Sequence, residues 1–141
     1  GIDGGTVFYG NIGSDEHMTN TVIGDTVNSA SRLEGLTRVY NLPVIVSAYI
    51  KEECEQETNR YHFYEIDTVQ VKGKTVGKKI YYPMDTMLSE KGLAAYYDGD
   101  WTSARKSFKA CALDVADVFL ERIGNKSAPA GWSGIWTMTT K

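Results

Sequence analysis

The order of apolar and polar residues predicts a β-hairpin followed by a helix at the start of the chain. Residues 6–10 and 18–23 alternate as half-buried strands do, and turn-forming residues lie between them. Apolar side chains then recur at helical spacing, at Val27, Ala30, Leu33 and Leu36. The helix is expected to begin at Asp25, whose carboxylate can cap the first free amides, and to end near residue 41.

The same kind of pattern continues with a short strand, a short helix and a second hairpin. Residues 44–46 form a brief apolar run, and Ser47 can cap a helix that runs through Cys54. Residues 61–72 and 79–83 alternate well enough for two strands around a glycine-containing turn. Elements in this order favour an α+β fold, with helices on one face of a sheet.

The last third of the chain has a purely helical pattern. Residues 86–97, 102–113 and 114–123 each have helical spacing, and an irregular tail follows them. We therefore expect two parts, residues 1–85 and an all-α extension with its tail, residues 86–141. The extension matches part of the tetratricopeptide spacing, but one such unit cannot bury its own apolar face. It is therefore expected to dock on the first part.

Composition describes a globular protein and excludes several classes. Hydrophobic residues make up 42% and charged residues 23% of the 141 residues, as in ordinary globular domains. The net charge of -3 argues against a nucleic-acid binder. The two cysteines lack the spacing of a metal site, and no apolar run approaches the ~18 residues of a membrane span. Within this mildly acidic chain, a local basic cluster is formed by Lys72, Lys74, Lys78 and Lys79.

Asn28 and Arg32 are the first candidates for chemistry. They lie four residues apart and therefore share one face of the expected helix, away from its apolar stripe. A guanidinium offers a rigid fork to phosphate oxygens, and an amide can both donate and accept a hydrogen bond. On geometry alone, an ordinary solvated polar face is favoured over a binding site.

The wider sequence around these residues resembles the class III adenylyl and guanylyl cyclases. Residues 21–34 resemble their signature V-I-G-D-x-V-N-x-A-S-R-L-E. Residues 1–14 resemble the hairpin G-I-x-x-G-x-V…G-N-I-G-S, and residues 66–74 resemble the strand L-D-x-V-x-V-K-G-K. Residues 44–47 fit the strand between them. The resemblance covers residues 1–84 with its motifs in the right order.

Residue by residue, the resemblance implies four site residues. Thr21 matches the position that reads the purine edge, which favours ATP over GTP. Asn28 matches the residue that orients the ribose, and Arg32 matches the residue that stabilises charge on the α-phosphate. Lys72 matches the lysine that holds the terminal phosphates. Asn20 replaces a usual aromatic or acidic residue, which leaves the purine choice open.

The resemblance also implies a fold and a reaction. The fold is the ferredoxin-like sheet of a nucleotidyl cyclase, present in part, and the reaction converts ATP to cyclic AMP and pyrophosphate. Family members use two Mg²⁺ or Mn²⁺ ions, whose aspartate ligands match none of Asp3, Asp15 and Asp25. These ligands are expected before residue 1, so the chain alone is expected to hold no metal and to be inactive. Family sites form between two protomers, so a homodimer or another oligomer is expected.

The chain opens without Met and without the features of a signal peptide. It is expected to be a cytoplasmic piece of a longer protein. That longer protein could be anchored in the inner membrane, but this piece is expected to make no membrane contact.

Missing strands would leave sheet edges and an apolar face uncovered. We expect either an oligomer or an extension that covers the gap, with apolar cover from Phe108, Val115, Phe119 and Leu120.

Two other functions remain open. A catalytically inactive pseudo-cyclase would bind nucleotide or dimerise as a regulatory module without turnover. Alternatively, residues 86–141 could form a protein-interaction module. Two aspartates in the metal motifs of the preceding sequence would favour the enzyme over the pseudo-cyclase. Binding of a partner by residues 86–141 alone would favour the interaction module.

Overall fold

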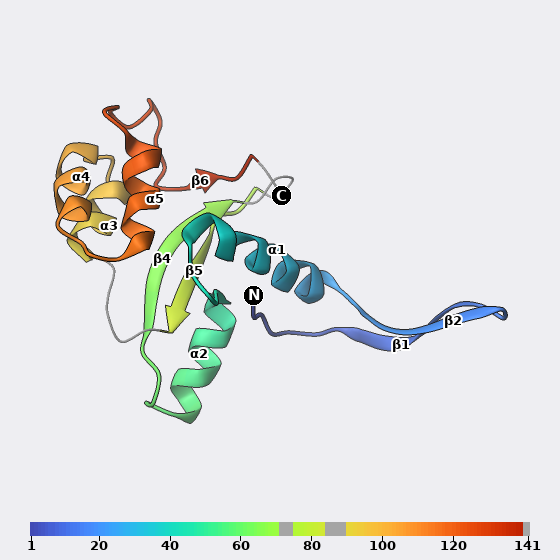
Figure 1. Cartoon of the computed structure of the whole chain (residues 1–141). Coiled ribbons are helices and arrows are strands. Elements are labelled where there is room, and N and C mark those ends of the chain that lie inside the picture. Colours follow the sequence, from blue (N-terminus) through green and yellow to red (C-terminus); the bar gives the residue numbers. More distant parts are fainter. Residues whose placement is uncertain (71–74, 84–89, 140–141) are drawn as a thin grey trace.

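The computed structural model describes residues 1–70, 75–83 and 90–139 and combines a small sheet with several helices (Figure 1). This mixture confirms the predicted α+β class. Among the described residues, no helix is both long and apolar enough to cross a membrane. In chain order the elements are β1 (Phe8–Ser14), β2 (His17–Ile23), α1 (Asp25–Tyr40), β3 (Val46–Ser47), α2 (Ala48–Glu57), β4 (Phe63–Gln70), β5 (Lys78–Pro83), α3 (Glu90–Tyr97), α4 (Trp101–Lys109), α5 (Asp114–Ile123) and β6 (Trp136–Thr137).

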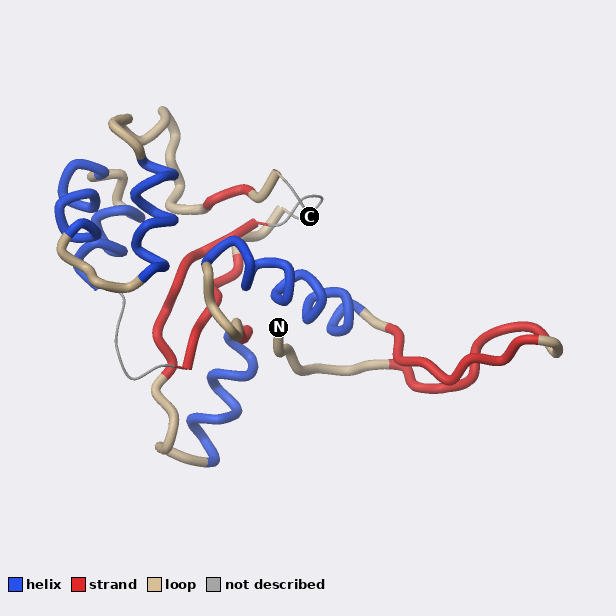
Figure 2. Tube along the Cα trace, in the orientation of Figure 1, coloured by secondary structure: helices blue, strands red, loops and turns tan. Residues whose placement is uncertain are grey.

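The first two strands form a separate hairpin, as the alternating pattern predicts. β1 pairs antiparallel with β2 from Phe8 opposite Ile23 to Ser14 opposite His17. The strands are longer than expected, because the turn between them narrows to residues 15 and 16. Figure 2 shows this hairpin, called the arm below, projecting away from the rest of the molecule.

The main sheet has the strand order β3-β5-β4-β6. β5 pairs antiparallel with β3 and with β4, which confirms the second predicted hairpin. β6 pairs parallel with β4, where Val69 lies opposite Trp136, and the Met138 nitrogen donates to the Gln70 carbonyl at 2.9 Å. The tail after α5 is therefore not wholly irregular, since part of it adds a strand to an otherwise unpaired edge of β4.

Helix α1 has the expected length but not the expected cap. Gly24, with φ 152°, is the N-cap residue, and no side chain caps this helix end. Glycine adopts such a positive φ without the steric penalty of a side chain. Asp25 instead lies in the first turn, where its charge is favourable at the positive end of the helix dipole. The buried side chains of α1 are Leu33, Leu36 and Tyr40.

Helix α2 begins as predicted. Ser47 is its N-cap, and the Ser47 hydroxyl oxygen accepts from the Ile50 backbone nitrogen at 3.3 Å. Ser47 also closes β3, so one residue ends the strand and starts the helix. This short strand–helix junction places the beginning of α2 beside the end of β3 and against β5.

The extension docks on the sheet and shares its core, as expected. Helices α3, α4 and α5 pack on one another, and α5 also contacts α1. Phe108, Val115 and Phe119 are fully buried, and Leu120 is half-buried against the same cluster. This cluster also contains Leu33 and other core residues of α1 and the sheet, so residues 90–139 complete the core instead of forming a separate one.

A buried ion pair fastens the extension to the sheet. The Arg122 Nη1 atom of α5 lies 2.5 Å from the Asp67 carboxylate of β4. The Tyr40 hydroxyl of α1 donates to the same carboxylate, and Arg122 donates to the Tyr40 and Tyr96 hydroxyl oxygens at 3.0 and 3.2 Å. Four elements, α1, β4, α3 and α5, therefore meet in one polar network within an aromatic core.

Candidate functional site

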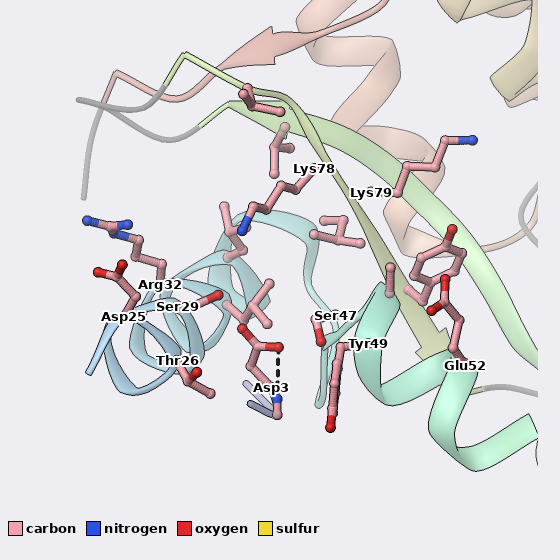
Figure 3. A pocket seen from close by; sticks show the side chains of 18 of the residues that line it. Asp3, Asp25, Thr26, Ser29, Arg32, Ser47, Tyr49, Glu52, Lys78 and Lys79 are labelled. Atoms are coloured by element: carbon pink, nitrogen blue, oxygen red, sulfur yellow. Dashed lines mark hydrogen bonds between the residues drawn. The ribbon is translucent and has the colours of Figure 1, made fainter. Parts of the chain in front are cut away.

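A pocket of about 840 Å³ lies between the N-terminal segment, α1, α2 and β5 (Figure 3). Its apolar lining includes Leu33, Leu36 and Ile80, and polar side chains project into it from each surrounding element. Ligand sites of small organic molecules have this range of volume and this combination of apolar lining and few polar groups. The polar lining that matters for the chemistry consists of Asp3, Ser29, Arg32, Ser47 and Lys78.

The structure brings one of the four predicted site residues to this pocket. Arg32 lines it from α1. Asn28 lies one turn earlier on the same helix and is exposed, but it is not part of the lining. Thr21 lies on the arm, opposite Gly10 of β1, and is partly buried away from the pocket. Lys72 lies outside the described residues.

Asp3 is a pocket residue that the sequence did not identify as a site residue. Its carboxylate accepts from the Gly4 backbone nitrogen at 2.8 Å. Although partial burial opposes ionisation, hydrogen bonds with the Ser29 and Ser47 hydroxyls and with Gly4 lower the pKa of the Asp3 carboxyl. In the sequence, Asp3 stood out only as an aspartate that does not match the metal ligands of the family.

Lys78 is the second residue that the sequence did not place in a site. It was visible only as a member of the basic cluster. In the structure it lines the pocket from β5, and its positive charge acts on Asp3. The next residue, Lys79, donates to the Glu65 carboxylate at 2.8 Å, and this hydrogen bond raises the pKa of Lys79. Lys79 also lines the pocket, so the two lysines differ in the ion pair that Lys79 makes with Glu65 and not in access to the cavity.

The pocket does not provide the ligands of a two-metal site. The described residues contain no group of three or more His, Cys, Asp or Glu side chains that could hold a metal ion. Asp3, the carboxylate on the N-terminal wall, already accepts a hydrogen bond from the Gly4 backbone nitrogen. Among residues 1–70, 75–83 and 90–139, the pocket therefore offers a nucleotide positively charged side chains, such as Arg32 and Lys78, that can bind its phosphates.

The proteins of known name that resemble this chain include several adenylate cyclases. The chain is 36% identical over 81 residues to adenylate cyclase 1 of Rhizobium meliloti (strain 1021), covering 57% of the chain and 12% of that protein. It is 38% identical over 82 residues to an adenylate cyclase of Anabaena cylindrica, covering 57% of the chain and 16% of that protein. The chain thus spans less than a fifth of the length of these relatives.

One solved structure, of a bacterial light-regulated adenylyl cyclase, matches with a TM-score of 0.47 and 32% identity. The match covers 57% of this chain and 22% of that one. The sequence profile described as "Adenylate and Guanylate cyclase catalytic domain" matches residues 1–88, which is more than half of the chain. This chain, with its signature helix α1 and its β4–β5 hairpin, belongs to the adenylate and guanylate cyclase catalytic domain family.

Proposed function

We propose that this chain is part of an adenylyl cyclase and supplies one half of a site that converts ATP to cyclic AMP and pyrophosphate. The proposal rests mainly on the position of Arg32. The cyclase signature predicts this residue as catalytic, and it lines the pocket from α1. The relatives named above are adenylate cyclases, which supports ATP as the substrate.

The proposal includes a division of the chain near residue 85, with a catalytic part before it and an extension after it. We place this domain in the cytoplasm, the compartment that supplies ATP.

The proposed reaction is an intramolecular phosphoryl transfer. The ribose 3′-oxygen attacks the α-phosphorus and releases its proton to water, while the bond from that phosphorus to the β-phosphate oxygen breaks and pyrophosphate leaves. Arg32 stabilises the charge that develops on the α-phosphate, because a guanidinium forms two parallel hydrogen bonds to phosphate oxygens. Asn28 orients the ribose, Thr21 reads the purine edge and Lys72 holds the terminal phosphates. When bound, two divalent ions would activate the attacking oxygen and neutralise the leaving group.

The positions of these residues support a site shared by two chains. Thr21 on the arm and Asn28 on the outer face of α1 do not line the pocket that contains Arg32. A second protomer could approach the arm, where large apolar side chains are exposed. These are Phe8, Tyr9, Met18 and Ile23. Exposed apolar patches of this kind mark association surfaces.

The test is cyclic nucleotide production by the longer protein that contains this chain. With ATP and Mg²⁺ or Mn²⁺, cyclic AMP and pyrophosphate should form in equal amounts, and GTP should be the poorer substrate because Thr21 favours adenine. Tight binding of ATP without any cyclic product would show that the protein is a pseudo-cyclase. A clear preference for GTP would overturn the role of Thr21.

A further inference from the structure

We propose that Lys78 is a phosphate-binding residue of this site and that it shares a diphosphate group with Arg32. The inference rests on the proposed function, since it concerns the same nucleotide. The resemblance assigns the phosphate-holding lysine to position 72, and the motif that carries this assignment, residues 66–74, ends before Lys78. The argument comes instead from the pocket.

The two cations reach the pocket from different elements. Arg32 projects from α1 and Lys78 from β5, and both line the same cavity. Figure 3 shows Lys78 extending from its strand toward the helix that carries Arg32. A guanidinium binds two oxygens of one phosphate, whereas an ammonium acts as a compact point charge. A diphosphate has enough oxygens to contact both groups at once.

Asp3 provides a negative charge on the wall of the pocket that Lys78 faces. The Asp3 carboxylate accepts from the Gly4 backbone nitrogen at 2.8 Å, and it lines the same pocket as Lys78. A lysine on an exposed strand would otherwise extend into solvent, because solvation and side-chain entropy both favour that state. The negative charge of Asp3 on the pocket wall favours orientations of the exposed Lys78 side chain that face the pocket.

The pocket is not strongly cationic as a whole. The carboxylates of Asp25 and Glu52 also line it, together with Asp3. Attraction of an anion therefore depends on close contact with Arg32 and Lys78 and not on a broad positive field. Binding of a diphosphate should accordingly weaken as the salt concentration rises. Small anions that cannot contact both cations should bind more weakly than a diphosphate.

Lys79 provides a matched control. It follows Lys78 directly, carries the same charge, lies on the same strand and also lines the pocket. Its ammonium, however, is paired with Glu65 at 2.8 Å. In Figure 3 its side chain points away from that of Lys78. Replacing Lys79 changes the net charge by the same amount as replacing Lys78 and leaves the proposed contact intact.

The experiment measures binding of inorganic pyrophosphate to the 141-residue chain by isothermal titration calorimetry. Lys78→Met and Arg32→Met should each weaken binding by about tenfold or more, the usual effect of losing one charge-assisted hydrogen bond. Lys79→Met should change it less than about twofold, since its charge is already paired. Lys78→Arg should retain most of the binding, because a cation remains. Circular dichroism of each variant checks that it is folded.

Two results would overturn the proposal. One is an equal effect of Lys78→Met and Lys79→Met, and the other is an absence of pyrophosphate binding by the unchanged chain at millimolar concentration. Neither result would bear on whether the longer protein produces cyclic AMP. Conversely, a longer protein that makes no cyclic nucleotide would refute the proposed function, while selective binding through Lys78 would still stand.

Discussion

Arg122 and Asp67 form the buried ion pair between the extension and the sheet. Their side chains are 5% and 0% exposed, so both charges are removed from water. Burial raises the pKa of the Asp67 carboxyl, and the adjacent Arg122 guanidinium opposes that rise. A buried pair of this kind is tolerated only when further hydrogen bonds satisfy both groups. The hydroxyls of Tyr40 and Tyr96 and the Thr68 amide supply those hydrogen bonds.

Breaking this pair should strongly destabilise the chain. Asp67→Asn leaves the Arg122 guanidinium buried without a counter-charge, and we expect a loss of about 3–5 kcal/mol in the free energy of unfolding. Urea denaturation measures the change. Arg38→Met is the control, because its exposed pair with Glu34 should contribute less than about 1 kcal/mol. Equal effects of the two substitutions would show that burial of the Asp67–Arg122 pair has no energetic consequence.

Arg32 is the residue with the clearest kinetic prediction. In the longer protein, Arg32→Ala should lower kcat by about 10²–10³-fold and change KM far less, because its contact strengthens in the transition state. Arg38→Ala, on the same helix but ion-paired with Glu34, should leave both constants near their original values. A large rise in KM at constant kcat would make Arg32 a ground-state binding residue instead.

At the scale of elements, the arm has little to stabilise it within one chain. A lone two-stranded hairpin is marginally stable in water. Phe8 and Met18 are each 63% exposed, and Ile23 is 48% exposed. The Asn20 side chain donates to the Tyr9 hydroxyl at 2.7 Å across the hairpin, which is a small contribution compared with the apolar surface left in water. Association with another chain would bury that surface.

We therefore expect the chain to self-associate through the arm. Phe8 and Ile23 lie opposite each other in the hairpin, so Phe8→Glu combined with Ile23→Glu places two charges at one spot. The double variant should shift the mass measured by light scattering after size exclusion to that of a monomer. Tyr61→Glu changes an exposed aromatic residue outside the arm and should have no such effect. A monomeric mass for the unchanged chain would contradict the prediction.

At the scale of the whole molecule, the sheet with α1 and the C-terminal helices share one buried core. Ile66 and Val69 of β4 lie in the same buried cluster as Phe108 and Phe119 of the extension. β6 adds to the edge of the sheet that β4 would otherwise leave open. Figure 1 shows α3, α4 and α5 on the opposite side of the molecule from the arm. The extension therefore covers the sheet without covering the arm.

Removal of residues 86–141 should therefore expose the core of the sheet. The truncated chain should aggregate, or bind a hydrophobic dye and unfold without a sharp transition, because its apolar face would meet water. Phe119→Ala in the intact chain should cost about 3–5 kcal/mol, as expected for a fully buried aromatic side chain. A soluble residue 1–85 chain with cooperative urea unfolding would refute the shared core.

Local features of this protein could be predicted from its sequence with good success. The bounds of α5 follow the predicted range 114–123, and Ser47 caps α2 as expected. The α1 helix and both hairpins also occur where their periodicity predicts them. These features depend on contacts within a few residues, such as helix repeats, turn chemistry and strand alternation. The family motifs around Arg32 are likewise contiguous in sequence.

Features that depend on distant residues could be read only from the folded chain. Arg122 and Asp67 are 55 residues apart, and no spacing rule pairs them. The same is true of β6, which joins β4, and of Lys78, which shares a pocket with Asp3. Even a local detail, the cap of α1, depended on the backbone at Gly24 and not on Asp25. Long-range packing selects these contacts, because the free energy of burying a group depends on everything that surrounds it in space.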